Sequence, residues 1–390
     1  MDILMLAPEP YFQPRGTPIS IFFRLKALSA MGHHVDLITY HLGEDRSFEN
    51  LSILRIPNLF GIKSVRIGPS WAKLPLDFLL LLKAAVRIFR HRYDLIYSHE
   101  EAALIGTALG LLRRIPHVYD MHSSLPQQLE NFQFTRSRLW IRVFQSIELF
   151  VLKHSASIIV ICPDLLRQVQ AAGQGNKAVM LENFLDFDPP RLSAAERQDM
   201  RDEYAGREEK IVLYAGNFQP YQGIPLLLEA AARMKDDPVR FLLVGDSPDA
   251  VARMQELAYE LGIGGRVRFT GQVPPDRIPM FLQLADGLVS PRLSGTNTPL
   301  KIYSFLKSGK PLVATALWTH TQVLDDRIAF LVDPDARSLA AGLKQALFTP
   351  QGIERAQAAL SRAESEYTFA RYREKMNLIL KTAQEIPERA

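Results

Sequence analysis

The chain has 390 residues, a hydrophobic fraction of 47% and a net charge of +4, which together predict a soluble globular protein of two domains. So small a net charge argues against a nucleic-acid partner. The single cysteine, Cys162, excludes an internal disulfide framework and favours a reducing, cytoplasmic location. The apolar run at 1–7 has no basic segment and is too short for a signal peptide, so we expect a buried strand there.

Short β-branched runs alternate with longer helical patterns through the first half of the chain. Strands are expected at 3–7, 35–40, 51–56, 94–98, 116–121 and 157–161, and helices at 17–31, 76–90, 102–112, 140–154 and 163–172. This alternation predicts a mainly parallel sheet with helices on both faces. The pattern then breaks at Asp186–Arg191 and at the charged stretch 194–210, which indicate a linker and a surface helix.

The second half repeats the same architecture. Strands are expected at 211–215, 240–244, 267–270, 287–290, 311–314 and 328–332, and helices at 223–234, 250–261, 278–284, 300–307 and 338–346. We therefore predict an α/β protein with two Rossmann-like parallel-sheet domains facing a cleft. The expected domains are 1–190 and 210–366, joined by a linker at 191–209, with a C-terminal helix at 367–390. Ligands bind beyond the carboxyl ends of such strands, where the polar signals of this sequence also lie.

The stretch from Ser290 to Thr315 is the strongest ligand signal. It contains four cations, Arg292, Lys301, Lys307 and Lys310, and no carboxylate occurs between Asp286 and Asp325. A small polar loop at 294–298, which includes Thr298, leads into the helix expected at 300–307. Free backbone N–H groups at a helix start, with a lysine in the first turn, favour a phosphate or diphosphate.

Two glycine-containing loops occupy equivalent places, each between the first strand and first helix of its domain. Gly16 follows Arg15, which could meet a phosphate, and precedes a helix-start signal at Thr17. In the second domain, Gly216 and Gly223 bracket the loop before the helix. Glycine permits a close approach of the backbone to a ligand, so both loops are candidate ligand-binding segments.

Acidic and histidine side chains follow two strands of the first domain. His99, Glu100 and Glu101 follow one strand, while Asp120 and His122 belong to the next. Two such clusters at neighbouring strand ends favour a functional site. The sequence has no metal-binding spacing, Walker A motif, nucleophile elbow or dinucleotide fingerprint, which argues against hydrolase, NTPase and dehydrogenase functions.

Several segments of the second half match one family pattern when they are taken together. They are Tyr214–Phe218, Gln222–Ile224, Leu227–Ala230, Phe241–Asp246, Val267–Gly271, Ser290–Arg292 and Ser308–Thr315. On these segments the chain resembles the retaining, nucleotide-sugar-dependent glycosyltransferases of family 4, which have the GT-B fold. The resemblance covers nearly the whole length. It implies that the first domain binds the acceptor, the second binds the donor, and the C-terminal helix crosses back to the first domain.

The sequence departs from this family at the donor site. The family has an arginine after the first glycine and a lysine before the second, where this chain has Asn217 and Gln222. The family also has two glutamates with seven residues between them; the corresponding positions here are near Thr296 and at Ser304, and neither is acidic. Arg292 and Lys301 offer replacement cations, so we expect a divergent subfamily with a reorganised donor site.

The resemblance implies a retaining reaction with no metal and no cofactor. The leaving diphosphate is stabilised electrostatically while the acceptor hydroxyl attacks from the same face. His122 matches the family histidine that contacts the sugar, and we expect Glu100 or Glu101 to orient hydroxyl groups of the sugar or the acceptor. The expected donor-binding residues are Gly16, Gly216, Asn217, Gln222, Arg292, Thr298, Lys301 and Ser304.

Basic residues near apolar segments suggest the chemical class of the acceptor. Cations at 83–92 follow the apolar run at 78–82, and Arg136, Arg138 and Arg142 surround Trp140. They favour peripheral contact with the inner face of a membrane, and hence a lipid-linked or envelope-glycan acceptor, although a solvated helix face gives the same pattern. Two other functions stay open: a non-catalytic nucleotide-sugar-binding protein and a sugar-nucleotide epimerase.

Overall fold

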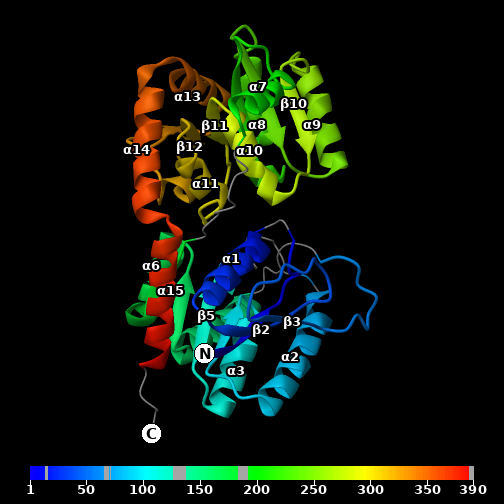
Figure 1. Ribbon diagram of the computed structural model, residues 1–390, viewed down its shortest axis with the longest axis vertical. Helices are drawn as coiled ribbons and strands as arrows, with labels where there is room; N and C mark the ends of the chain where they lie inside the picture. Colours follow the sequence, from blue (N-terminus) through cyan, green and yellow to red (C-terminus); the bar gives the residue numbers. More distant parts are fainter. Residues whose placement is uncertain (14–15, 66–69, 71, 126–137, 183–191, 386–390) are drawn as a thin grey trace. The chain divides into compact units, whose positions relative to one another are not determined.

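The computed structural model describes residues 1–13, 16–65, 70, 72–125, 138–182 and 192–385. The chain divides into two compact units (Figure 1). The N-terminal unit consists of Met1–Asn183 with Phe369–Ala390, and the C-terminal unit of Phe184–Thr368. The expected α/β architecture with two parallel sheets is confirmed. The linker segment Asp186–Arg191 lies outside the described residues.

The N-terminal unit contains a seven-stranded sheet in the order β3-β2-β1-β4-β5-β6-β7. Its strands are β1 (Asp2–Ala7), β2 (His34–Thr39), β3 (Leu51–Arg55), β4 (Leu95–His99), β5 (His117–Met121), β6 (Ser157–Val160) and β7 (Ala178–Met180). Its helices are α1 (Gly16–Ala30), α2 (Lys73–Arg90), α3 (Ala102–Arg113), α5 (Arg138–His154), α6 (Pro163–Ala171) and α15 (Phe369–Gln384). Strands β1, β4 and β5 are buried on both faces; β1 is almost continuously apolar, whereas β4 and β5 also carry buried polar residues such as His99 and Asp120.

The two faces of this sheet are covered by different helices. Leu4 and Leu6 of β1 pack with the inner side chains of α2 and α3. Asp120 points to the opposite face from its neighbours in β5 and meets Arg24 of α1. Helix α15 packs against α1 and the strands β5, β6 and β7. The C-terminal helix is therefore part of the N-terminal unit.

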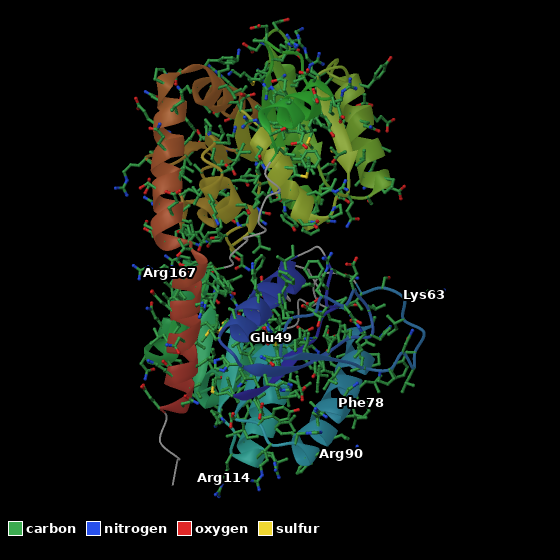
Figure 2. All side chains as sticks on the ribbon, viewed as in Figure 1. Glu49, Lys63, Phe78, Arg90, Arg114 and Arg167 are labelled. Carbon is green, nitrogen blue, oxygen red and sulfur yellow. The ribbon has the colours of Figure 1, made fainter. Side chains whose placement is uncertain are left out.

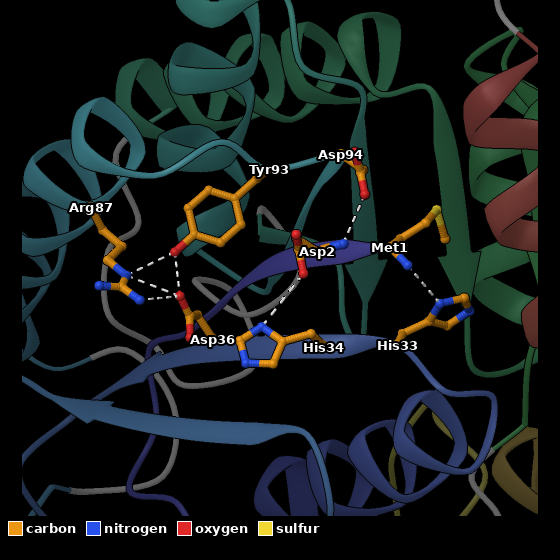
Figure 3. A network of polar contacts seen from close by, with 8 residues as sticks. All are labelled: Met1, Asp2, His33, His34, Asp36, Arg87, Tyr93 and Asp94. Atoms are coloured by element: carbon orange, nitrogen blue, oxygen red, sulfur yellow. Dashed lines mark hydrogen bonds and ion pairs between the residues drawn. The ribbon is translucent and has the colours of Figure 1, made fainter.

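Helix α2 is fixed to the sheet at its C-terminal end. Figure 2 labels Phe78 and Arg90 on this helix. Within it, Arg87 donates from Nε and Nη2 to Asp36 Oδ2 of β2, at 2.9 and 2.7 Å. Tyr93 donates to the same oxygen (Figure 3). Burial alone raises the pKa of Asp36, but the hydrogen bonds from Tyr93 and Arg87 outweigh it and lower the pKa.

The C-terminal unit contains a six-stranded parallel sheet in the order β10-β9-β8-β11-β12-β13. Its strands are β8 (Lys210–Ala215), β9 (Val239–Val244), β10 (Val267–Gly271), β11 (Gly287–Ser290), β12 (Leu312–Thr315) and β13 (Phe330–Val332). Its helices are α7 (Ala194–Asp202), α8 (Ile224–Ala232), α9 (Pro248–Glu260), α10 (Ile278–Leu284), α11 (Lys301–Lys307), α12 (Trp318–Thr321), α13 (Ala336–Phe348) and α14 (Pro350–Glu366). Helix α7 begins with a capping box between Ser193 and Glu196.

Helix α14 was not expected from the sequence. Its buried side is made of small residues, Gly352, Ala356, Ala359 and Ala363, so its pattern lacks the large apolar side chains that mark an amphipathic helix. Ala359 and Ala363 pack in one core cluster with Ile302 and Phe305 of α11. Small side chains let the two helices approach closely, and α14 thereby supports the helix that carries Lys301.

Candidate active site

The glycine loop of the C-terminal unit lies directly against the segment that follows β11. A Cβ atom at Gly223 would stand 1.9 Å from the carbonyl oxygen of Pro291, and Gly223 has φ +72°. Leu293 N donates to Tyr221 O at 2.9 Å and joins the same two segments. Only glycine fits at position 223. The structure thus brings together the two loops that the sequence identified separately.

Lys301 lies beneath this loop. Its Nζ is 3.4 Å from Gln222 Oε1 and 3.9 Å from the centre of the Tyr214 ring. A Cβ at Gly216 would be 3.0 Å from the same nitrogen. Within the described residues, no carboxylate forms an ion pair with Lys301. Burial, and then the charge of Arg292, lower the pKa of Lys301 well below its usual value.

Arg292 is the second cation of the site. Its Nη1 donates to Asn297 O at 3.2 Å and to Thr319 Oγ1 at 3.0 Å, and its guanidinium lies 5.2 Å from the centre of the Tyr221 ring. Arg292 Nε is buried and has no hydrogen-bond partner among the described residues, as is the case for Thr298 Oγ1. These polar groups without hydrogen-bond partners, together with the positive charges of Arg292 and Lys301, favour binding of an anionic ligand.

The other expected donor residues differ in their surroundings. Ser304 lies one helical turn after Lys301 on α11 and is partly buried. Asn217 has a local role, because its Oδ1 accepts from Gln219 N at 3.3 Å and its carbonyl oxygen accepts from Tyr214 Oη at 2.6 Å. Gly16 begins α1 in the N-terminal unit, where a Cβ would meet no atom within 4 Å. Arg15 lies outside the described residues.

The sequence did not identify the residues that support Arg292. Thr319 and His320 of α12 follow the end of β12, the same position relative to a strand that marked the other candidates. His320 Nε2 is 2.9 Å from Ser290 Oγ, and Thr315 Oγ1 donates to Arg292 O at 2.7 Å. Burial lowers the pKa of His320 to about 4, so this histidine is neutral at pH 7.

In the N-terminal unit, His122 stands beside a buried ion pair. Its Nε2 is 3.2 Å from Asp120 Oδ1, and Asp120 Oδ2 accepts from Arg24 Nε at 2.8 Å and from Tyr97 Oη at 2.5 Å. Tyr372 of α15 hydrogen-bonds to Arg24. Burial alone raises the pKa of Asp120, but Arg24 and His122 hold it well below its usual value. Asp120 is therefore a fixed negative charge that orients His122.

Glu100 and Glu101 have different environments. Glu100 has φ +48° and is buried, and its Oε2 accepts from Ser123 Oγ at 2.9 Å. Burial, and then the charge of Glu101, raise the pKa of Glu100 well above its usual value and favour the protonated, neutral form of its carboxyl. Glu101 instead accepts from Lys73 Nζ at 2.7 Å. A neutral carboxyl group can donate a hydrogen bond to a hydroxyl group of a ligand.

One group of ligand atoms has the spacing of a metal site. Single atoms of His99, Asp120 and His122 all lie within 4.8 Å of one another. Arg24 already neutralises Asp120 at 2.8 Å, so a divalent cation here would meet a buried guanidinium. That these residues hold no metal stays a prediction.

Comparisons with known proteins bear on both units. A family model described as "Glycosyltransferase Family 4" matches residues 16–188, and one described as "Glycosyl transferases group 1" matches residues 209–348. The chain belongs to the family 4 glycosyltransferases with the GT-B fold. Both candidate sites therefore lie in units of an enzyme that transfers sugars.

Named relatives and a solved structure agree with this assignment. The glycosyltransferase is 26% identical to the phosphatidyl-myo-inositol mannosyltransferase of Mycolicibacterium smegmatis over 88% of this chain and 84% of that protein. It is 23% identical to the alpha-monoglucosyldiacylglycerol synthase of Streptococcus pneumoniae over 88% of this chain and 77% of that protein. The crystal structure of Anabaena HepE in complex with UDP has the same fold, with a TM-score of 0.77, 19% identity and coverage of 98% and 100%.

Proposed function

We propose that this glycosyltransferase moves a sugar, with retention of anomeric configuration, from a nucleoside diphosphate sugar to a hydroxyl group of a lipid-linked or envelope-glycan acceptor. The observation that carries the donor part is the pair Lys301 and Arg292. Two half-buried cations that pair with no carboxylate among the described residues are costly in the free enzyme, and a diphosphate supplies the missing negative charge.

The reaction follows from where charge develops. The bond between the anomeric carbon and the β-phosphate oxygen breaks, and the diphosphate gains negative charge next to Lys301 and Arg292. The acceptor oxygen bonds to the anomeric carbon from the same face, and its proton passes to the leaving phosphate oxygen. His122, oriented by Asp120, hydrogen-bonds to the sugar. Glu100, whose burial favours the protonated carboxyl, donates a hydrogen bond to a hydroxyl group of the sugar or the acceptor.

The names of the relatives support the ligand classes. HepE was crystallised with UDP and UDP-glucose, and the mannosyl- and glucosyltransferase relatives are named for lipid acceptors. For this chain we propose a nucleoside diphosphate sugar and a hydroxyl-bearing glycan or lipid acceptor. No metal or other cofactor takes part in the proposed reaction.

The donor site can be tested by thermal shift with UDP, GDP, ADP and their sugars, using the wild type and Lys301→Ala. One nucleotide should raise the Tm of the wild type, and the variant should lose most of that rise. Transfer is then measured from that radiolabelled donor to membrane lipid extracts, and the anomeric configuration of the product is read by NMR. Tight donor binding without transfer to any acceptor would instead favour a non-catalytic sugar-nucleotide-binding protein.

A further inference from the structure

The outer side of α2 is apolar, although it faces solvent. Leu74, Phe78, Leu82, Val86 and Phe89 recur every three or four residues and are 47–59% exposed. The opposite side of the same helix, with Leu76, Leu80, Ala84 and Ile88, is buried in the core. A surface helix normally has polar residues on the side away from the core. The exposed stripe is therefore not explained by packing within the N-terminal unit.

The exposed apolar surface continues over the neighbouring helices. Helix α3 adds Leu104, Leu111 and Leu112, and α5 adds Leu139, Trp140, Val143 and Phe150, all of them exposed. Helix α3 contacts both α2 and α5. The Arg113 guanidinium lies 5.0 Å from the centre of the Phe89 ring, and a shallow hollow between α3 and α5 is lined by Leu104, Val143 and Phe150. We call the exposed side chains of α2, α3 and α5 the outer face.

The outer face carries charge of one sign. The sequences of α2, α3 and α5 contain only two carboxylates, Asp77 and Glu148, and both are turned inward. Asp77 accepts from Tyr40 Oη, while Glu148 accepts from Ser124 Oγ and Leu125 N. The exposed charges on these helices are the cations Arg90, Arg113, Arg142 and Lys153, and the exposed Arg92 and Arg114 follow the ends of α2 and α3. Figure 2 labels Phe78, Arg90 and Arg114 in this unit.

We propose that the outer face docks on an anionic lipid bilayer, with the apolar side chains at the level of the headgroups and the arginines paired with lipid phosphates. Apolar surface surrounded by cations is the pattern that binds such a bilayer. A second copy of this chain is a poor occupant, because two faces of the same positive charge repel each other. No helix among the described residues is long and apolar enough to cross a membrane, so the face lies on the surface.

Helix α2 connects the outer face to the proposed acceptor residues. Its first residue, Lys73, pairs with Glu101 at 2.7 Å and Glu9 at 3.4 Å, beside Glu100, while Leu74 next to it is exposed. The contacts of Arg87 with Asp36 fix the other end of the helix. Docking therefore holds the carboxyl edge of the sheet at the headgroups, where a lipid-linked acceptor can enter. This last step rests on the proposed function, whereas the docking itself does not.

The test is co-sedimentation of the whole protein with phosphatidylcholine vesicles, with and without phosphatidylglycerol, at low and high salt. The wild type should bind the anionic vesicles at low salt. The double substitution Phe78→Glu with Leu82→Glu should weaken binding by at least about tenfold. Tyr259→Glu with Ile353→Glu is the matched control, because it adds the same charge at exposed apolar positions of the C-terminal unit and should bind as the wild type does.

Three outcomes would overturn the proposal. They are a wild type that stays in solution with anionic vesicles, equal binding by the two double variants, and a wild-type dimer that the outer-face variant dissociates without any vesicle binding. The thermal shift of every variant with nucleotide, measured without vesicles, distinguishes the docking proposal from the proposed donor site. A protein that binds vesicles but no nucleotide refutes only the donor site, and one that binds nucleotide but no vesicles refutes only the docking.

Discussion

Replacing Lys301 by methionine should weaken nucleotide binding and also stabilise the ligand-free protein. The Nζ of Lys301 has only Gln222 Oε1, at 3.4 Å, and the Tyr214 ring as close partners among the described residues. Hydrogen bonds to a charged group contribute about 1.5–3 kcal/mol, so the Kd for the bound nucleotide should rise by roughly 10- to 150-fold. Methionine fills a similar volume without a buried charge, which should raise Tm by about 2–4 °C for each kcal/mol gained.

Calorimetry can detect the proton that accompanies binding. Because the pKa of Lys301 is lowered in the free protein and a diphosphate favours its charged form, binding should take up a proton. Affinity should therefore fall as the pH rises above the lowered pKa. Titrations of UDP in two buffers of different ionisation enthalpy should give different heats for the wild type and equal heats for Lys301→Met.

Lys307→Met is the control, because Lys307 is exposed at the other end of α11. It should change Tm and Kd little. The reasoning fails if Lys301→Met binds the nucleotide within about twofold of the wild type, or if its ligand-free Tm falls.

Three further changes test other parts of the structure. Gly223→Ala should lower stability by more than about 2 kcal/mol in urea unfolding and weaken nucleotide binding, since its Cβ would overlap Pro291 O; unchanged stability would contradict the role of this turn. Asp120→Asn should cost about 3–5 kcal/mol because Arg24 stays buried without its partner, and adding Arg24→Met should recover part of that loss. The free energy of unfolding of Asp77→Asn, measured relative to the wild type at the same pH, should increase between pH 4 and 7. The pKa of Asp77 rises from 3.8 to about 7 on folding through burial and the charge of Glu101, so the wild type loses stability as the pH rises through that window; parallel pH profiles would refute this.

The sequence was sufficient to predict most of the fold. Strands β1 and β8, which lie inside their sheets, are nearly continuous apolar runs because helices cover them on both sides, and such runs are easy to recognise. Strand β7 was missed because it has three residues and lies at the edge of its sheet. Helix α14 was missed because its buried side is built from alanine and glycine.

The candidate site was predictable only where its residues lie close together in the chain. Arg292, Thr298 and Lys301 come from one segment, so their composition marked them directly. The contact between Arg24 and Tyr372 joins residues 348 positions apart, and Lys73 meets Glu101 across 28 positions. No local pattern contains such pairs. The raised pKa of Glu100 could not be inferred either, because it depends on burial that only the folded unit creates.

The return of α15 to the N-terminal unit constrains how acceptor domains can be exchanged among family members. A hybrid enzyme that takes only 1–183 from this chain would keep Arg24 and Asp120 but would receive a foreign last helix in place of Tyr372. Sequence changes in α1, β5 and α15 therefore have to be inherited together, although α15 lies far along the chain from the other two elements. Recombination that preserves function needs two crossover points, one before the donor domain and one after it.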